Sequence, residues 1–408
     1  MTGATRRVVI TGLGSICALG DRPDRIYEAL CDGRTGFGAP SVFPADAVPG
    51  HVVAEIPAFA PQTYLGERNI RPLDRTGRLA AVGVELALAD AQWPAAERRE
   101  RGIGLILGTM FCSVRTIGEF DRRAQHAGPE YASPLDFSNT VLNAAAGQVA
   151  IWHGLPGVNT TIASGAVSGL HAIGYAATLI RTGRASILVA GGVEEVCFES
   201  CFGFLRAGLL ARPSGDVPGC AVPFDIRRTG MALGEGAAFL VLEDEDVAVA
   251  RGARILGRVD GLASAYDPRS EAERGSPAGL TYAIERALTD AGVTAADIGA
   301  VASSAGGSPV QDVREGAAIR ATIGPTTPVT ALKSMLGETL GASGALNAMA
   351  MIQSLRAHRL PGVAGFGTPD EAIDLAVAPA VQSIRGSRGL VTAVAPEGNC
   401  HALVLGVE

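Results

Sequence analysis

The sequence predicts an α/β protein made of two similar halves, and three observations support this prediction. Short apolar runs that end in glycine are typical of buried strands. Segments with helical spacing of apolar residues lie between these runs, and such alternation produces a sheet covered by helices. The pattern starts again after the charged run at 243–246, EDED. We therefore expect residues 1–250 and 251–408 to be two variations on one unit.

The first half begins with a strand expected at 6–14, RRVVITGLG, which ends in a glycine turn. Helices are expected where apolar residues recur every three or four positions, and strands where apolar residues follow one another. The helices of this half are expected at 73–91, 140–153 and 168–181, and its other strands at 104–109, 158–162, 187–192 and 237–242.

The second half repeats this alternation from residue 254 onward. No linker rich in proline or serine separates the halves, so we expect one compact body. Strands are expected at 254–262, 298–303, 389–395 and 402–406, and helices at 277–291 and 342–355.

The composition describes a well-buried globular protein. Of the 408 residues, 47% are hydrophobic and 18% are charged, which is too apolar for a disordered chain. The net charge of −7 argues against a nucleic-acid partner. No signal-peptide pattern opens the chain, and no apolar stretch approaches the roughly 18 residues of a membrane helix, so we expect a cytoplasmic protein without a membrane partner. The seven unclustered cysteines predict neither disulfides nor a metal site, and we expect no cofactor.

The most informative segment is 160–174, TTIASGAVSGLHAIG, because it predicts a sharp turn from a strand into a helix. The small residues at 163–166 form the turn, and the helix begins near Ser168. Such an elbow places one side chain at a helix N-terminus, where the dipole and free N–H groups stabilise a thiolate or an oxyanion. The residue at the tip is Ala166, and its methyl group cannot act as a nucleophile.

Three further segments follow the elbow: PFDIRRTGMALGEGAAFLVLE at 223–243, VASSAGGSPVQDVRE at 301–315 and ALKSMLGETLGASGALN at 331–347. With the elbow and the opening strand, they closely resemble the β-ketoacyl synthase family of condensing enzymes over essentially the whole chain. The resemblance implies the thiolase-like fold of that family, in which two similar halves have central mixed sheets covered by helices.

The resemblance also implies where a condensing enzyme would carry its catalytic groups. That family uses a cysteine at the elbow and two histidines, one in an HGT.T.P-like loop and one in a KS..GH motif. The thiolate carries the acyl chain, and the imidazoles stabilise the enolate formed when malonyl thioester loses carbon dioxide. The three positions here hold Ala166, Ser304 and Glu338. No catalytic residue is therefore expected, and an ionised Glu338 would repel the enolate.

Other parts of the family's site remain. Lys333 is the only lysine of the chain, and it lies in the KSM motif. The resemblance implies that Asp312 and Glu315 are its acidic partners, so we expect a buried ion-pair network that shapes the loops, with a fortuitous surface lysine as the alternative. Pro396 replaces the aromatic residue that gates the acyl pocket in the family.

Family members without the nucleophile are known as a class, the chain-length-factor or ketosynthase β subunits of type II polyketide synthases. Each forms a heterodimer with an active ketosynthase α subunit, and the polyketide tunnel lies along the interface. The resemblance implies that this chain is such a subunit of a β-ketoacyl-[acyl carrier protein] synthase complex, and that it meets acyl carrier protein mainly through its partner. Most such subunits have glutamine at the elbow, where this chain has Ala166.

By the same resemblance, two short segments are expected at the subunit interface, beside the acyl tunnel. Phe111 is the best candidate for a wall that limits the length of the product, because an acyl chain cannot pass through packed side chains. Ordinary interface packing is the alternative role of Phe111. The residues expected at the tunnel and interface are Phe111, Cys112, Val114, Arg115, Asp136 and Phe137.

Two alternatives would keep catalysis in this chain. Ser164 and Ser168 flank Ala166, and a serine-dependent acyltransferase or hydrolase would use one of them, although neither lies in a GxSxG pattern. Cys400 stands beside His401, but neighbours on a strand point to opposite faces. A phosphonate probe would label a catalytic serine, whereas a partner subunit would co-purify with a ketosynthase.

Overall fold

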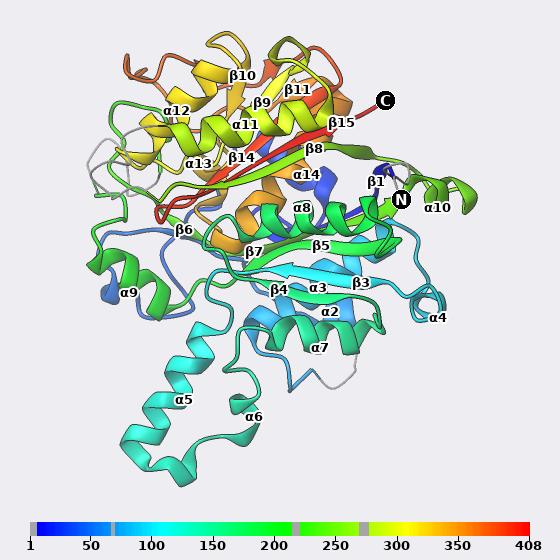
Figure 1. Cartoon of the computed structure of the whole chain (residues 1–408). Coiled ribbons are helices and arrows are strands. Elements are labelled where there is room, and N and C mark those ends of the chain that lie inside the picture. The colour runs from blue at the N-terminus through cyan, green and yellow to red at the C-terminus, as the bar shows by residue number, and fades with distance from the viewer. Residues whose placement is uncertain (1–5, 67–69, 214–220, 269–276) are drawn as a thin grey trace.

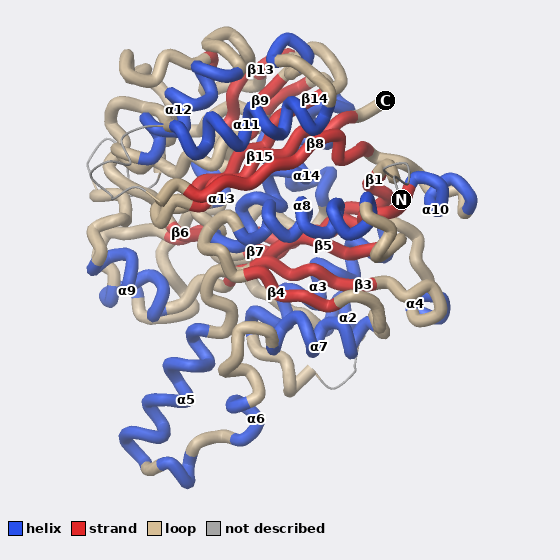
Figure 2. The backbone as a smooth tube through the Cα atoms, in the orientation of Figure 1, coloured by secondary structure: helices blue, strands red, loops and turns tan. Residues whose placement is uncertain are grey.

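The computed structural model describes residues 6–66, 70–213, 221–268 and 277–408, and its helices and strands form five alternating layers (Figures 1 and 2). The strands of both halves join in one 11-stranded sheet with the order β12-β10-β9-β14-β15-β8-β1-β7-β5-β3-β4. Its strands are β1 Val8–Cys17, β3 Gly104–Gly108, β4 Asn159–Ile162, β5 Ile187–Glu194, β7 Gly236–Asp244, β8 Gly257–Tyr266, β9 Ala300–Ala302, β10 Pro328–Thr330, β12 Ala376–Val377, β14 Arg388–Val394 and β15 Asn399–Gly406.

The two halves have the same topology. Numbered along the chain, β1, β3, β4, β5 and β7 lie in the sheet in the order 3-2-4-5-1, and so do β8, β9, β10, β14 and β15. In each half the fifth strand is antiparallel to its two neighbours, while the second strand is parallel to both of its own. The halves meet where β1 pairs with β8. The expected α/β fold with two similar halves and mixed sheets is therefore confirmed.

Helices cover both faces of the sheet in an equally repeated way (Figure 1). Gly12 in β1 and Gly261 in β8 make this possible, because a Cβ at either position would collide with a backbone oxygen of the covering helix, that of Ala87 or Ala287. The outer layers contain α3 Arg75–Asp90 with α7 Ala144–His153 and α11 Ala278–Ala291 with α12 Gln311–Thr322, and the middle layer contains α8 Ser168–Arg181 with α14 Ser343–Ala357.

Most long elements lie within a few residues of their expected positions, and α8 matches its expected range of 168–181. Several helices were not predicted from the sequence; the apolar residues of α12 lack helical spacing, whereas α1 (Pro23–Cys31) and α5 (Val114–Ala127) are amphipathic and lie in segments for which no element was predicted. The other α-helices and strands of the described residues are α1 Pro23–Cys31, α2 Gln62–Leu65, α4 Ala95–Arg98, α5 Val114–Ala127, α6 Pro134–Phe137, α9 Phe198–Arg206, α10 Glu245–Ala250, α13 Lys333–Leu336 and the short strand pairs β2 Val53–Ala54 with β6 Leu233–Gly234 and β11 Arg359–Leu360 with β13 Gln382–Ser383.

Helices α5 and α6 form an arm that projects from the body of the protein (Figure 1). We define the arm as residues 114–138, none of which is buried. The Phe120 and Phe137 rings, 5.8 Å apart, and an ion pair of 3.1 Å between Arg123 and Asp136 hold its two sides together. Within the described ranges, no helix has the length and apolarity needed to cross a bilayer.

Candidate functional site

The elbow lies between β4 and α8, where the sequence predicts it. Gly165 has a φ of +70°, a conformation that favours glycine, and Ala166 follows it at the tip. Ser168 holds the turn together, since its hydroxyl donates to the carbonyl oxygen of Gly165 at 2.6 Å and accepts from the N–H of Ser164 at 2.9 Å. The hydroxyl of Ser168 is thus committed to the backbone, and the tip residue carries no reactive group.

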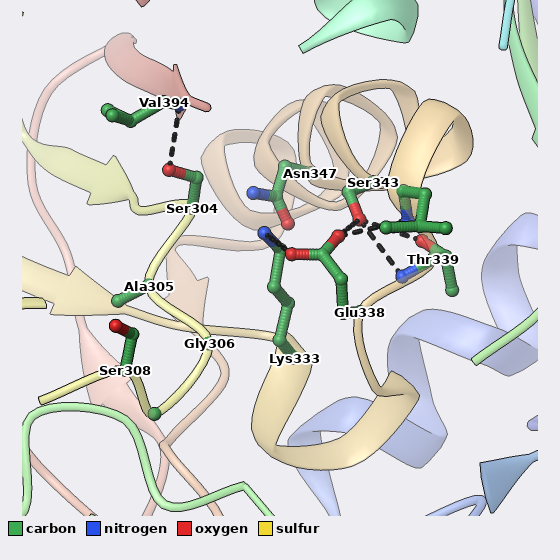
Figure 3. Close-up of polar contacts among 12 residues, drawn as sticks. Ser304, Ala305, Gly306, Ser308, Lys333, Glu338, Thr339, Ser343, Asn347 and Val394 are labelled. Carbon is green, nitrogen blue, oxygen red and sulfur yellow. Dashed lines mark hydrogen bonds and ion pairs between the residues drawn. The ribbon is translucent and has the colours of Figure 1, made fainter. Parts of the chain in front are cut away.

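Ser304 begins the loop that leads from β9 to α12. Its N–H and its hydroxyl both donate to Glu315, at 2.8 and 3.0 Å, and its hydroxyl oxygen accepts from the N–H of Val394 at 3.1 Å (Figure 3). Glu315 is 2% exposed and also accepts from the hydroxyl of Thr392. Ser304 therefore connects α12 to the end of β14, and its hydroxyl is not free to serve as a donor to a substrate.

Asp312, one turn before Glu315 on α12, holds the rest of this loop. Both of its carboxylate oxygens accept backbone N–H groups, and burial raises the pKa of Asp312 to about 6. Three successive N–H groups of this loop, together with one from the segment around residue 224, fix the path of the loop through hydrogen bonds to a single carboxylate. The N–H donors are those of Phe224, Gly306, Gly307 and Ser308, at 3.0 to 3.3 Å.

The ion pair of Lys333 differs from the expected one. Its Nζ donates to Oε2 of Glu338 at 2.5 Å, and each residue is 5% exposed. Asp312 and Glu315 already receive neutral donors from their own loop, so the ammonium group pairs with the carboxylate that follows α13. The prediction of a buried ion-pair network with Asp312 and Glu315 as the partners of Lys333 is therefore wrong in its pairing, and a surface position of Lys333 is excluded.

Glu338 is satisfied at both oxygens. While Oε2 faces Lys333, Oε1 accepts from the N–H of Leu340 at 2.9 Å and from the hydroxyl of Ser343 at 2.7 Å (Figure 3). The negative charge of Glu338, which was expected to repel an enolate, is thus paired with the ammonium group of Lys333 in place. Neither Glu338 nor Lys333 offers the neutral N–H donor that an imidazole would supply.

Close glycine contacts pack the segments of the three altered positions against one another. A Cβ on Gly169, in the first turn of α8, or on Gly192, near the end of β5, would collide with the carbonyl oxygen of Gly341. A Cβ on Gly306 would lie 3.8 Å from Oε2 of Glu338. The segment after Glu338 therefore packs on the elbow helix, and the loop after Ser304 packs on the Lys333–Glu338 pair.

The loop after β14 covers the elbow. A Cβ on Gly165 would collide with the side chain of Glu397 and would lie 3.5 Å from Cβ of Ala395. Pro396, the expected substitute for the gate, is exposed in this loop, as is Glu397. The approach to the tip is thus covered by an acidic side chain in place of the aromatic one that the resemblance implies.

Two histidines lie behind the elbow. The hydroxyl of Ser164 and Nδ1 of His171 are 3.2 Å apart, and the ring of His171 stacks on that of His401 with 4.3 Å between centroids. Burial lowers the pKa of His171, and burial together with His171 lowers the pKa of His401 to about 3, so both rings are neutral near pH 7. A cavity of about 180 Å³ borders both rings and the side chain of Tyr175.

The six residues expected at the tunnel and interface lie in two places. Phe111 and Cys112 form the turn after β3, where Phe111 is half-buried against Phe204, with 6.1 Å between ring centroids, and Cys112 is 1% exposed. The other four belong to the arm: Val114 and Arg115 begin α5, and Asp136 and Phe137 lie in α6.

Glu194, at the end of β5, is a central residue that was not predicted from the sequence. Its carboxylate accepts from the N–H groups of Met110, Phe111 and Gly341 at 2.6, 3.0 and 3.2 Å, and from the hydroxyl of Thr109 at 3.1 Å. Burial raises the pKa of Glu194 to about 7. An acidic residue that ends an apolar strand run was the available signal in the sequence.

The site has no thiol at position 166 and no imidazole at positions 304 and 338, which are the groups that condensation requires there. Across the described segments, no three His, Cys, Asp or Glu side chains meet as a possible metal site. Cys400 is also a poor nucleophile, because burial raises the pKa of its thiol to about 12. What the site retains is a set of loops held by buried carboxylates.

Known protein families match both halves of the chain. The family described as "Beta-ketoacyl synthase, N-terminal domain" matches residues 5–248, and "Beta-ketoacyl synthase, C-terminal domain" matches residues 256–366. The 3-oxoacyl-[acyl-carrier-protein] synthase 2 of Vibrio cholerae is 31% identical over 385 residues, which cover 92% of each chain.

Solved structures show the same similarity. The ishigamide ketosynthase/chain length factor superposes with a TM-score of 0.92 at 29% identity, covering 99% of this chain and 100% of that one. A β-ketoacyl synthase from Burkholderia phymatum gives a TM-score of 0.90 at 28% identity, with the same coverage. The chain is thus similar both to condensing enzymes and to a structure that includes a chain length factor.

The first prediction concerns the buried ion pair. Lys333→Met leaves the carboxylate of Glu338 buried without its cation, so we expect the free energy of unfolding to fall by about 3–5 kcal/mol. The double variant Lys333→Met/Glu338→Gln removes both charges and keeps an oxygen acceptor, and it should recover most of that loss. Urea unfolding followed by circular dichroism measures both values.

The matched control is Arg7→Met, which breaks the exposed ion pair between Arg7 and Glu245 and should cost at most about 1 kcal/mol. Equal losses in Lys333→Met and Arg7→Met would contradict the assignment of Lys333 and Glu338 as a buried structural pair.

Proposed function

We propose that this chain, which belongs to the β-ketoacyl synthase family, is a non-condensing chain-length-factor subunit that pairs with an active ketosynthase and shapes its acyl tunnel. The observation that carries the proposal is Ala166 at the tip of an otherwise complete elbow. A protein with this scaffold and no nucleophile can bind and position, but it cannot hold an acyl chain as a thioester.

The other two altered positions support the same function. Ser304 is committed to Glu315 and Val394, and Glu338 is committed to Lys333. Neither offers a donor to an enolate oxygen, which is the group that decarboxylation requires to be stabilised. The curated relatives are condensing enzymes by name, so the proposal depends on these residues and not on overall similarity.

The similarity to the ishigamide ketosynthase/chain length factor supports the proposed partner. The arm supports it independently, because a projecting segment with no buried residue and exposed apolar side chains is typical of an interface. Carrier protein would then deliver acyl groups mainly to the partner, in polyketide or polyene biosynthesis.

A serine-dependent acyltransferase or hydrolase is the second candidate, favoured by the contact between Ser164 and His171. A hydroxyl beside a neutral imidazole is the arrangement of an activated nucleophile. Labelling by a fluorophosphonate probe that disappears in Ser164→Ala would favour this function. The position of Ser164 two residues before the tip, and not at it, favours the partner subunit.

The second prediction tests the proposed function directly. The pure chain incubated with malonyl-carrier protein should release carbon dioxide only at the background rate, because no thiolate or imidazole stands at the three positions. Adding a ketosynthase whose own cysteine and histidines are intact should give a heterodimer that condenses. Carbon dioxide release by the pure chain well above background would contradict the proposal.

The third prediction is that Ala166→Cys alone does not restore condensation. The variant regains a thiol, but two imidazole donors are still missing. The loss of each such donor raises the activation barrier by about 2.7–4 kcal/mol. We therefore expect turnover at least about 10⁴-fold below that of an intact ketosynthase. The assay uses a heterodimer whose partner has lost its nucleophilic cysteine, so that any product must come from Cys at position 166. Robust turnover would show that the donor positions are wrongly assigned.

The fourth prediction concerns the wall of the tunnel. Phe111→Ala removes a half-buried ring packed against Phe204, and the opened space should let the heterodimer make longer products at comparable flux. Mass spectrometry of the products measures their length. Phe202→Ala, which removes a ring stacked on Phe198, is the control and should leave product length unchanged. Unchanged length with weaker subunit association in Phe111→Ala would make Phe111 a packing residue only.

A further inference from the structure

The turn between β14 and β15 holds an acidic side chain over the elbow. The N–H of Gly398 donates to the carbonyl oxygen of Ala395 at 3.0 Å, which closes a β-turn. Pro396 occupies the second position of this turn, where the ring of proline suits the required φ, and Glu397 occupies the third. The backbone that carries the Glu397 side chain therefore has little conformational freedom.

The turn is also anchored to its surroundings. The N–H of Ala395 donates to the carbonyl oxygen of Asn399 at 2.9 Å, which joins its two ends. Gly398 has a φ of +110°, and its carbonyl oxygen accepts from the N–H of Asp267 at 2.9 Å. A Cβ on Gly398 would collide with the carbonyl oxygen of Asp267. Because a movement of the turn would break these contacts, the paired strands β14 and β15 fix the position of Glu397.

The carboxylate of Glu397 lies directly against the elbow. A Cβ on Gly165 would collide with Oε1 of Glu397 and would lie 3.0 Å from its Cδ. Glycine at position 165 thus leaves room for this side chain, in addition to adopting the positive φ of the turn. Ala166, the next residue, is partly exposed. The carboxylate therefore stands beside the position that a nucleophile would occupy.

The N-terminus of α8 favours a negative group at this place. The helix has 14 residues, and its dipole presents a partial positive charge toward the elbow. In a condensing enzyme this charge would favour the thiolate, or the oxyanion formed from a thioester. Here the chain itself brings a carboxylate to the same end of the helix. Glu397 is exposed, and exposed carboxylates are ionised near pH 7, so a negative charge faces the elbow.

We propose that Glu397 excludes acyl thioesters from the elbow of this chain. Its side chain fills the space over Gly165, and its charge opposes the carboxylate of a malonyl group. The inference rests on the proposed function, in which the partner ketosynthase receives the acyl groups, and it adds the residue that keeps the inactive elbow from competing for them. Two like charges a few ångströms apart in a partly hydrated site repel each other enough to change binding severalfold.

The fifth prediction uses Ala166→Cys as a reporter of access to the tip. The new thiolate displaces iodide from neutral iodoacetamide or from anionic iodoacetate, and mass spectrometry of the peptide that contains position 166 gives both alkylation rates. Adding Glu397→Gln keeps the size of the side chain and removes its charge. The rate with iodoacetate should then rise at least about fivefold relative to the rate with iodoacetamide. This ratio isolates the charge of the reagent, because a change in the thiol itself affects both rates alike.

Glu397→Ala tests the steric role with the same reporter. Truncation of the side chain opens the space over Gly165, so the rate with neutral iodoacetamide should exceed that of the Glu397→Gln variant at least about threefold. Acetyl transfer from acetyl-N-acetylcysteamine, seen as a gain in mass, should rise in parallel. In that step the thiolate at position 166 attacks the thioester carbonyl, a new thioester forms, and N-acetylcysteamine leaves as its thiolate.

The matched control is Glu97→Gln, which makes the same change at an exposed glutamate of α4. Helix α4 precedes β3, whereas the elbow follows the parallel strand β4, so the two lie at opposite ends of these strands. Glu97→Gln should leave both rates unchanged, and equal effects of Glu97→Gln and Glu397→Gln would overturn the proposal.

The two roles of Glu397 fail separately. An unchanged ratio of rates in Glu397→Gln would overturn the electrostatic role, and an unchanged iodoacetamide rate in Glu397→Ala would overturn the steric role. Circular dichroism of each variant checks that the fold is retained. Neither failure bears on the proposed function, which carbon dioxide release by the pure wild-type chain would contradict independently of these rates.

Discussion

The ion pair between Lys333 and Glu338 is the interaction on which the shape of the altered site depends. An ammonium group buried to this degree is tolerated only beside an opposite charge. The backbone of Glu338 is fixed as well, since its N–H donates to the carbonyl oxygen of Ala232 at 2.7 Å and its own carbonyl accepts from Gly234 at 3.0 Å. The pair therefore joins α13, β6 and the first turn of α14 into one unit.

Three other buried carboxylates also hold the loops of the site, and within the described residues none of the three forms an ion pair. Glu194, Asp312 and Glu315 accept almost entirely from backbone N–H groups and hydroxyls. Each of these acceptors ties together segments that are far apart in the sequence, such as the turn after β3 and the segment after Glu338. The result is a rigid site whose polar groups are satisfied by one another. A condensing site must instead keep donors free for the substrate, and this difference is a physical argument for a role other than condensation.

The sequence was sufficient for the fold and for the position of the elbow, because both follow from periodicity and from long motifs. It was not sufficient for the partner of Lys333, since three acidic residues lie within reach by sequence and only their other donors decide among them. The α5 helix of the arm was not predicted from the sequence, although Val114, Ile117 and Phe120 recur at helical spacing; its mean apolarity is low and none of its residues is buried. Glu194 and Glu195 stand side by side in the sequence, yet one accepts four hydrogen bonds and the other none.

The difference between Glu194 and Glu195 also distinguishes two regions of the molecule, the altered site and the root of the arm, where α5 begins. At the site, Ser304 and Glu338, which stand at two of the altered positions, have hydrogen-bond partners within the chain. At the root of the arm, the Glu195 carboxylate has no hydrogen-bond partner among the described residues, and several apolar side chains of the arm are exposed. Folding alone favours removal of such groups, because each costs free energy in the isolated protein. The exposed apolar side chains of the arm are typical of a surface that another protein covers, which agrees with the interface proposed for the arm, and the satisfied site supports that surface from within the body.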